Sequence, residues 1–473
     1  MTTDQLGPAP APDDAARKHE RRGWYFYDWA NSTFYTSVIT VFGAAYVTSM
    51  AQSDARNDTA RNGPNPCPGD AEAGDSSLVD CDIGVLGLDI AVGSLWPYLI
   101  AVATIVQLLV FPLLGGIADR TQRKKQLLGF FAFLGALATC SLVFVTDWEW
   151  ALPVYIVAQV GYGASIVIYY SFLADVADAD ERDEVSARGW AFGFLGGFVA
   201  LGLQLVIYEG RDLFGIDEGM AVRICFLLSG LWWAGFTLIP LRRLKDRPSP
   251  RPNHPGSGVV RAGFAEIWRT IREAKAYPLT LAFLGAYLVF NDGIQTVVTQ
   301  SAHYGKETLG FEQDTLITTI LLVQFVAFVG GWLHGLLARR FGAKPTMIGS
   351  LCVWILVIVS AYFLQPGDKV SFYLVGAGIG IVLGGTVALS RSLYSQMIPA
   401  GKEAQYFSMY EITERGTAWI GPQLFGAIGA ATGSFRPAIL ALAGFFVVGI
   451  VLVALVPVRR AIVAAGNTPP EKI

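Results

Sequence analysis

Charged residues are scarce in this chain of 473 residues: Lys, Arg, Asp and Glu together make up 15%, whereas hydrophobic residues make up 53%. The mean hydropathy is +0.45, and spans of about 20 residues with almost no charge recur along the sequence. This composition excludes an ordinary soluble enzyme. It predicts an all-α polytopic membrane protein that lies in the lipid bilayer.

Patterns for metal binding and catalysis are missing as well. The four histidines show no ligand spacing, no pair among the five cysteines has metal-site spacing, and no nucleophile–base set is evident. The run GAGIGIVLGG at 376–385 follows no strand, so its glycines at every fourth position are expected to pack one helix face rather than to bind a nucleotide. We therefore expect no enzyme activity, no cofactor, no metal and no nucleic-acid partner.

Twelve apolar spans predict twelve transmembrane helices. They lie near 24–50, 88–117, 126–146, 150–174, 188–208, 221–241, 277–300, 313–338, 345–364, 370–394, 405–431 and 436–457. We expect two six-helix bundles, at 24–241 and 277–457, joined by a cytoplasmic linker at 242–276. Residues 1–23 and 458–473 are expected to be cytoplasmic tails, the first because it is polar and contains no apolar core of a signal peptide.

Basic residues set the expected orientation. They cluster at 120–125, 242–275 and 339–344, in loops that fall on the same side as the N-terminal tail, whereas the opposite loops carry few. The positive-inside rule then places both termini in the cytoplasm of a cell-membrane protein. Within the linker, residues 263–274 have the apolar spacing of a short basic amphipathic helix, which favours a membrane-surface anchor over a regulatory partner site.

The loop at 51–87 is long, acidic and extracytoplasmic in this arrangement. It holds Cys67 and Cys81, and a disulfide between them would close a 15-residue loop on the oxidising side of the membrane. Two unpaired thiols remain the alternative. The other cysteines, Cys140, Cys225 and Cys352, lie in apolar spans and are expected to be packing residues.

Polar residues inside two apolar spans point to a shared interior. A carboxylate at the bilayer centre costs about 2.5–3.5 kcal/mol, so it must face protein or water. The phrase YDWANSTFY at 27–35 resembles FNDGIQTVV at 290–298, and Asp28, Asn31 and Tyr35 have the same spacing as Asp292, Gln295 and Thr299. Each trio is expected on one helical face, with Asn291 beside the second.

These phrases resemble a known family. GGIADRTQRKK at 115–125 resembles the cytoplasmic loop signature of the major facilitator superfamily. Within that superfamily, YDWANSTFY, ARGWAFGFLGG and YLVFNDGIQTVV resemble the vacuole-effluxer branch, whose best-known members export amino acids from the yeast vacuole. The resemblance implies two six-helix bundles that rock about a central site and give alternating access.

The resemblance also implies a cytoplasmic gate. Asp119 is expected near the start of the eleventh helix, and Arg120 and Arg123 are expected to meet Asp175 and Asp178 at the end of the fourth. The alternative is a loop that is charged only because it is wet. The second copy of the signature has Arg339 in place of the Asp, so any gate is expected to be asymmetric.

Later charges are open to two interpretations. Arg391 near the cytoplasmic end of the tenth span, with Tyr394 one turn on, is a candidate to hold a substrate carboxylate or a structural residue. Glu411 and Arg415 have the spacing of a pair that neutralises itself. Tyr169 and Tyr170 are either cavity-lining residues or interfacial anchors.

Together these features predict a secondary active transporter, monomeric, moving a small polar metabolite such as an amino acid with protons. Desolvation at mid-membrane makes Asp292 the expected proton carrier, and Asp28 is expected to serve binding or gating. A lipid or amphiphile transporter is the alternative within the same class. A non-transporting assembly factor or sensor is the alternative from another class, and the mirrored polar trios favour transport over it.

Overall fold

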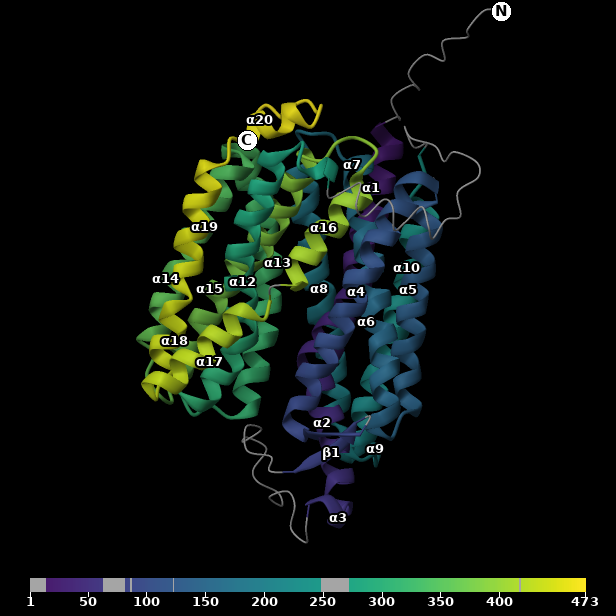
Figure 1. Ribbon diagram of the computed structural model, residues 1–473, viewed down its shortest axis with the longest axis vertical. Coiled ribbons are helices and arrows are strands. Elements are labelled where there is room, and N and C mark those ends of the chain that lie inside the picture. The colour runs from purple at the N-terminus through teal and green to yellow at the C-terminus, as the bar shows by residue number, and fades with distance from the viewer. Residues whose placement is uncertain (1–13, 63–80, 86, 122, 248–271, 417) are drawn as a thin grey trace, which may run out of the picture.

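The computed structural model describes residues 14–62, 81–85, 87–121, 123–247, 272–416 and 418–473. These residues are mostly helical, and the helices form two groups, which we call the first half (α1–α10) and the second half (α12–α20; Figure 1). The all-α fold with two bundles was predicted from the sequence. The predicted linker helix at 263–274 lies largely outside the described residues.

The first half opens with three helical segments that follow one another without a break, α1 (Asp14–Thr33), the π-helix η1 (Phe34–Phe42) and α2 (Gly43–Asn57). Its other long helices are α4 (Leu95–Thr121), α5 (Lys124–Ser141), α6 (Trp148–Ser171), α8 (Arg182–Glu209) and α10 (Glu218–Arg243). Short elements connect them: α3 (Thr59–Asn62), η2 (Val92–Ser94), η3 (Leu142–Phe144), α7 (Leu173–Val176), α9 (Arg211–Phe214) and the antiparallel hairpin of β1 (Asp82–Val85) and β2 (Leu88–Ala91).

The second half repeats the arrangement with one difference. Its helices are α12 (Pro278–Glu307), α13 (Gln313–Phe341), α14 (Ala343–Tyr362), α15 (Lys369–Gln396), α16 (Glu403–Gly416), α17 (Ile420–Thr432), α18 (Phe435–Ala441), α19 (Ala443–Leu455) and α20 (Val458–Ala464). Among the described residues, 11 helical segments are long and apolar enough to cross a membrane. The predicted span at 405–431 is not one of them, because it is divided into α16 and α17.

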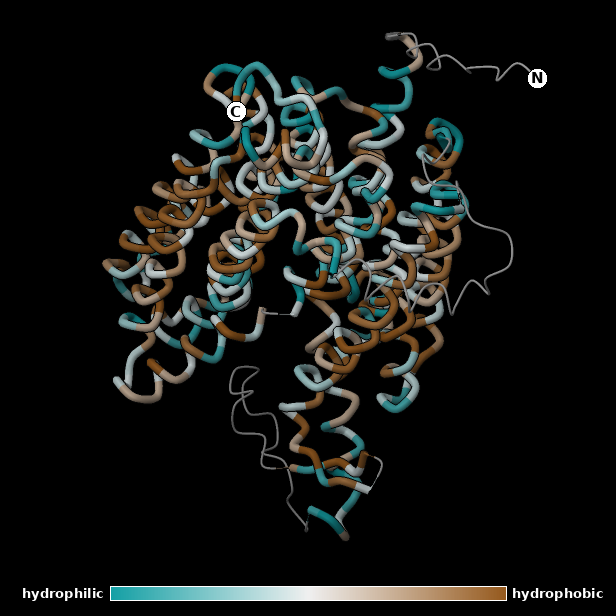
Figure 2. Tube along the Cα trace, turned by 45° about the horizontal axis from the view of Figure 1, so that its top comes forward, coloured by the Kyte–Doolittle hydropathy of each residue, from teal (hydrophilic) through white to brown (hydrophobic). Residues whose placement is uncertain are grey.

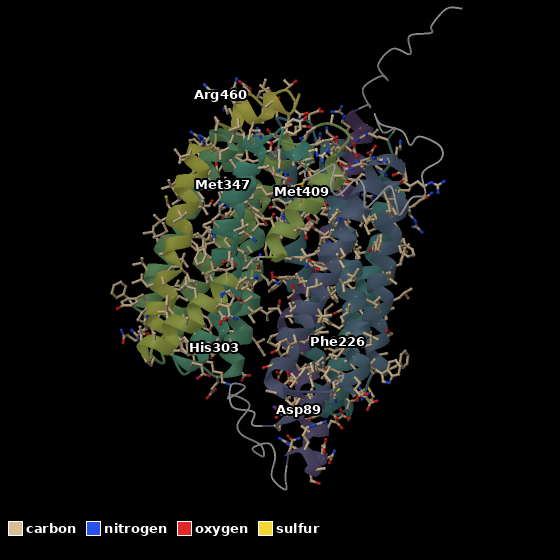
Figure 3. The ribbon with its side chains drawn as sticks, in the orientation of Figure 1. Asp89, Phe226, His303, Met347, Met409 and Arg460 are labelled. Carbon is tan, nitrogen blue, oxygen red and sulfur yellow. The ribbon has the colours of Figure 1, made fainter. Side chains whose placement is uncertain are left out.

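Basic helix ends mark one end of the molecule. The start of α1 and the C-terminus lie at this end, which we call the terminus side, and the hairpin lies at the other, the loop side (Figure 1). Figure 3 shows Arg460 at the terminus side, and Asp89 and His303 toward the loop side. The helices α4, α10 and α13 end in arginines at the terminus side, and hydrophilic residues gather there in Figure 2.

Small residues bring the two halves together. The helix α8 packs against α13 and α15, and α4 packs against α16. A Cβ on Gly115 of α4 would lie 2.7 Å from the Ala404 carbonyl oxygen, so only glycine permits this approach. Within the second half, Gly376, Gly380 and Gly384 all face α13, where an added Cβ would lie 2.9 Å from the nearest atom. The prediction that this glycine row serves packing is therefore confirmed.

Candidate transport pathway

The polar stripes of the two halves meet where Tyr35 of η1 approaches Gln295 of α12. The Tyr35 hydroxyl donates to Gln295 Oε1 at 3.5 Å. Tyr35 keeps 37% of its surface exposed, whereas its neighbours Phe34 and Thr36 are buried. A π-helical segment changes the direction in which successive side chains point, and such segments are frequent at functional sites. The π-helix therefore presents Tyr35 to the interface between the halves.

Arg415 lies in the last turn of α16, one residue before this helix ends at Gly416. Its Nε and Nη2 atoms both lie 3.0 Å from Glu411 Oε2, so the predicted mutual neutralisation of this pair is observed. Its guanidinium carbon also lies 5.8 Å from the ring centre of Phe111 and 5.5 Å from that of Tyr162. Both rings belong to the first half. Arg415 is therefore held by its own helix while it faces the other half.

Glu414 adds a second carboxylate at this level. It accepts a hydrogen bond of 2.7 Å from the hydroxyl of Tyr287, whose ring stacks on Tyr410 at 4.2 Å. Among the described residues Glu414 has no basic side chain within ion-pair distance. The central cluster, as we call this group, thus presents charges of both signs between the halves; its members are Tyr35, Tyr287, Gln295, Glu411, Glu414 and Arg415.

Asp292 lies at the middle of α12, fourteen residues after Pro278 and fifteen before Glu307. It is 2% exposed, and neither carboxylate oxygen has a hydrogen-bond partner among the described residues. The backbone N–H of Gly421, in the first turn of α17, faces this carboxylate without reaching hydrogen-bond geometry. The positive end of the α17 dipole is therefore directed at a buried acid.

The predicted trio on α12 does not share one environment. Gln295 reaches the first half, whereas Asp292 faces α17, and Thr299 donates to the Gln295 carbonyl of its own helix at 2.9 Å. Asn291 is buried, and within the part of the chain that the structure describes its Oδ1 atom has no hydrogen-bond partner. It lies midway between Tyr287 and Gln295 in a row of every fourth residue. The three residues of the trio lie on one face of the continuous helix α12, as predicted, but their neighbours along that face differ, because the start of α17 packs against Asp292.

The first-half trio also separates along the helix. Asp28 is 7% exposed and accepts a hydrogen bond of 2.6 Å from the Tyr169 hydroxyl. Asn31, one turn further on, is buried, and its Nδ2 atom has no hydrogen-bond partner in the described ranges. Only Tyr35 contacts the second half at the level of the central cluster. Asp28 instead belongs to a group of contacts nearer the terminus side.

Asp119, at the end of α4, caps a helix of the other half. Its two carboxylate oxygens accept from the backbone N–H groups of Ala404 and Gln405, both at 2.9 Å. These N–H groups belong to the first turn of α16, where the helix dipole favours an anion. The position of Asp119 at the start of the eleventh span agrees with the sequence-based expectation.

The acidic residues after the fourth span have other partners than those predicted. Among the described ion pairs, Asp175 is joined by Lys124 at 3.4 Å and by Arg247 at 3.6 Å, and Asp178 by Arg17. Arg120 and Arg123 form none of these pairs. Lys124, the next residue in the signature, also approaches Glu403 of the second half at 3.7 Å. Lys124 therefore makes the contact with Asp175 that was expected of Arg123.

Arg391 of α15 is fully buried among residues of the first half. Its Nε atom donates to Ser186 Oγ at 3.0 Å, Nη2 donates to the Ser186 carbonyl at 2.9 Å, and Nη1 lies 3.5 Å from Asp28. Four aromatic rings surround the guanidinium carbon at 4.7–5.7 Å. We call this group the aromatic cage; it consists of Trp24, Tyr169, Tyr170 and Trp190.

The residues near Arg391 are buried and make packing contacts or hydrogen bonds inside the protein. Tyr394 donates to the Tyr406 carbonyl at 2.9 Å and packs inside the second half. Tyr169 and Tyr170 are buried in the cage, so the interfacial-anchor interpretation is wrong for both. Ser392 donates to Asp183 of the first half. Arg391 and Ser392 thus join α15 to α8 on the terminus side.

The cysteines agree in part with expectation. Cys81 is disulfide-bonded, and Cys140, Cys225 and Cys352 are free thiols. Cys67 lies outside the described residues, so the pairing of Cys67 with Cys81 stays a prediction.

Sequence reasoning missed two features of the pathway. The break after α16 has a signal in Gly416, Gly421 and Pro422, since glycine and proline weaken a helix and proline fits the first turn of the next one. The aromatic cage has a weaker signal, because Trp24 and Trp190 are separated by 166 positions. Nothing in the sequence indicates that they meet.

This fold has solved counterparts. The human organic anion transporter MFSD10 matches with a TM-score of 0.65 at 12% identity, over 92% of this chain and 99% of its own. The Escherichia coli fucose:proton symporter FucP matches with a TM-score of 0.62 at 12% identity, over 93% and 98%. These likenesses confirm the polytopic all-α fold of major facilitator superfamily transporters.

The family is shown by sequence. The family described as "Vacuole effluxer Atg22 like" matches residues 16–466, so the chain belongs to it. An uncharacterized MFS-type transporter of Bacillus subtilis is 27% identical over 445 residues, 93% of this chain and 95% of that relative. Autophagy-related protein 22-1 of Penicillium rubens is 24% identical over 550 residues, 95% and 92%. The chain is therefore a multi-pass membrane transporter and not an enzyme.

Proposed function

We propose that this protein is a secondary active transporter that moves a small zwitterion, such as an amino acid, by alternating access. The observation that carries the proposal is the central cluster, where Glu411, Glu414 and Arg415 gather at a helix break between the halves. Charged groups inside a membrane are costly and usually mark a substrate or ion pathway. A non-transporting scaffold has no need of them.

The cluster has the chemistry to recognise both ends of a zwitterion. A guanidinium binds a carboxylate with two parallel hydrogen bonds, and Arg415 keeps 18% of its side chain exposed. Glu414 supplies a carboxylate for the ammonium group. Tyr35 and Gln295 supply a hydroxyl and an amide from opposite halves, so a bound substrate bridges them.

The present conformation is closed on the terminus side. Asp119, Asp183 and Ser186 of the first half bond there to the second half. Toward the loop side, the last cross-half hydrogen bonds among the described residues are those of Tyr35 with Gln295 and of Thr36 with Gln324. Substrate therefore enters from the loop side in this state, and rocking of the halves opens the terminus side.

The basic helix ends support a cell-membrane protein whose terminus side is cytoplasmic. We propose that the protein is a monomer and that a proton gradient drives its transport. Asp292 is the proposed proton carrier. Burial favours its neutral form, and the positive end of α17 favours the carboxylate. A balance of this kind is easily shifted when a substrate cation approaches.

Uptake by proteoliposomes tests the proposal. The purified protein is presented with a panel of radiolabelled amino acids, with and without a pH gradient. We expect at least one zwitterion to accumulate only with the gradient, Arg415→Gln to lose this uptake, and the surface variant Arg460→Gln to keep it. The proposal is wrong if no zwitterion is transported, or if Arg415→Gln transports as well as the unmodified protein.

A further inference from the structure

The aromatic cage is built entirely by the first half. Trp24 comes from α1, Tyr169 and Tyr170 from α6, and Trp190 from α8, whereas the cation inside it, Arg391, comes from the second half. Electron-rich ring faces around a guanidinium are the usual recognition chemistry for organic cations. Asp28 adds a carboxylate 3.5 Å from the guanidinium.

The cage does not depend on Arg391 for its shape. The Trp24 indole N–H donates to the Tyr169 carbonyl at 3.0 Å, and the two rings stack at 4.5 Å. The Tyr169 hydroxyl in turn holds Asp28 at 2.6 Å. These contacts join α1 to α6 inside one half, so the part of the cage formed by Trp24, Tyr169 and Asp28 is preformed and survives a rigid movement of that half. Tyr170 also packs against Phe407 and Tyr410 of the second half.

Opening of the terminus side empties this cage. Among the described residues, the polar contacts of Arg391 with the first half are those to Ser186 and Asp28, and the remaining contacts are to the ring faces of the cage, so Arg391 withdraws with α15 when the halves separate. The first half is then left with a carboxylate and four ring faces, all arranged around the volume of a guanidinium. A buried carboxylate without a cation is unfavourable, and an organic cation from solution restores the lost interactions.

We propose that the aromatic cage, with Asp28, is a binding site for an organic cation carrying an ammonium or guanidinium group, exposed when the terminus side opens. Arg391 occupies the site in the present conformation as an intramolecular competitor. The proposal rests on the alternating access of the proposed function. It gives the ammonium group of the transported zwitterion a second binding site on the terminus side. Arg391 expels that group as the terminus side closes.

A ligand that binds only one state must shift the population toward it. The probe is methylguanidinium, with methylurea as its uncharged analogue of the same shape. Nitroxides at Gln126→Cys on α5 and Arg460→Cys on α20, with Cys352→Ser, report the distance across the terminus side in detergent. We expect methylguanidinium to raise the population with the longer distance, and methylurea to have no effect.

Three variants distinguish competition between Arg391 and methylguanidinium for the cage from a general weakening of the closed terminus side. Arg391→Ala removes the competitor and is expected to lower the half-maximal methylguanidinium concentration by about 100-fold. Asp28→Asn is expected to abolish the response. Asp119→Asn weakens closure on α16, away from the cage, and is expected to lower that concentration less than Arg391→Ala. If Arg391→Ala does not fold, Ser186→Ala, which loosens the competitor, is expected to act in the same direction.

The proposal is overturned if methylguanidinium acts no differently from methylurea in every variant, or if Arg391→Ala and Asp119→Asn change the response equally. It is also overturned if only a lower pH opens the terminus side, because Asp28 then takes a proton in place of a cation. These measurements need no transport, so a protein that fails the uptake test but binds methylguanidinium refutes the proposed function alone.

Discussion

Two arginines of the second half face aromatic rings of the first half, but they are held in opposite ways. Arg391 has no exposed surface, and its hydrogen bonds to described residues all go to Ser186 of the other half. Arg415 is partly exposed, and its hydrogen bonds run to Glu411 of its own helix. The partners of Arg391 are therefore lost when the halves separate, whereas the partner of Arg415 moves with it.

This difference assigns different roles to similar chemistry. A contact made in only one conformation sets the balance between conformations. A contact kept in all of them leaves that balance unchanged, and Arg415 stays available to a ligand in either state. We therefore regard Arg391 as a determinant of conformation and Arg415 as a determinant of substrate affinity. Substitutions at the two sites are expected to separate these effects.

The largest effect is expected from Arg391→Gln. Removing one partner of a buried ion pair costs about 3–5 kcal/mol, and here the cost falls only on the state closed at the terminus side. We expect that state to lose at least about 100-fold in relative population. Electron–electron distances across the terminus side measure the change. A distribution that stays closed would contradict the assignment of Arg391 as a contact specific to one state.

Asp292→Asn tests the proposed proton carrier, which lies apart from the two arginines compared above. Asparagine keeps the size of the side chain but carries no exchangeable carboxylic proton, so we expect accumulation driven by a pH gradient to disappear while exchange of labelled for unlabelled substrate continues. For one proton per substrate, accumulation of about tenfold per pH unit is lost. If Asp292→Asn folds normally and still accumulates substrate fully, Asp292 is not the proton carrier.

Arg415→Lys is expected to have a smaller effect, confined to affinity. Lysine keeps the charge but loses the planar fork that binds a carboxylate through two hydrogen bonds. We expect the apparent KM for the transported zwitterion to rise about tenfold, which corresponds to about 1.4 kcal/mol, with an unchanged distance distribution across the terminus side. A shifted distribution would show that Arg415 also sets the conformation, and would remove the contrast with Arg391.

The sequence predicted the parts of this molecule that hydropathy determines. Long apolar spans, a central linker and basic loops were sufficient for two bundles and the family resemblance. Asp119 was also predicted at its partner helix, because its loop signature is local. The break in the eleventh span was missed, although Gly416, Gly421 and Pro422 carry a signal for it, because apolar residues resume after Gly416 and the whole stretch was taken as one span.

Contacts between the halves were largely beyond sequence reasoning. Arg391 and Asp28 are separated by 363 positions, and neither position carries a pattern that names the other as its partner. The repeat aligned Asp292 with Asp28, yet the two acids have different surroundings. The start of α17 faces Asp292, whereas Tyr169 and Arg391 surround Asp28. Depth along a helix was predictable from spacing, and the neighbouring helix was not.

The smallest shift is expected from Asp119→Asn, which weakens a second contact specific to the closed state. Asparagine retains one acceptor for the α16 N–H groups, but it loses the negative charge and turns an amide donor toward the other N–H. A hydrogen bond to a charged group contributes about 1.5–3 kcal/mol, so losing part of this interaction should move the population toward the open terminus side by about tenfold, less than Arg391→Gln. The matched control is Asp178→Asn, because Asp178 pairs with Arg17 inside the first half and its substitution removes the same charge without touching the interface. The same distance measurement is used for both variants. An unchanged distribution in Asp119→Asn, or an equal shift in the control, would mean that the capped start of α16 does not hold the terminus side closed, and Arg391 would then be the main determinant of closure.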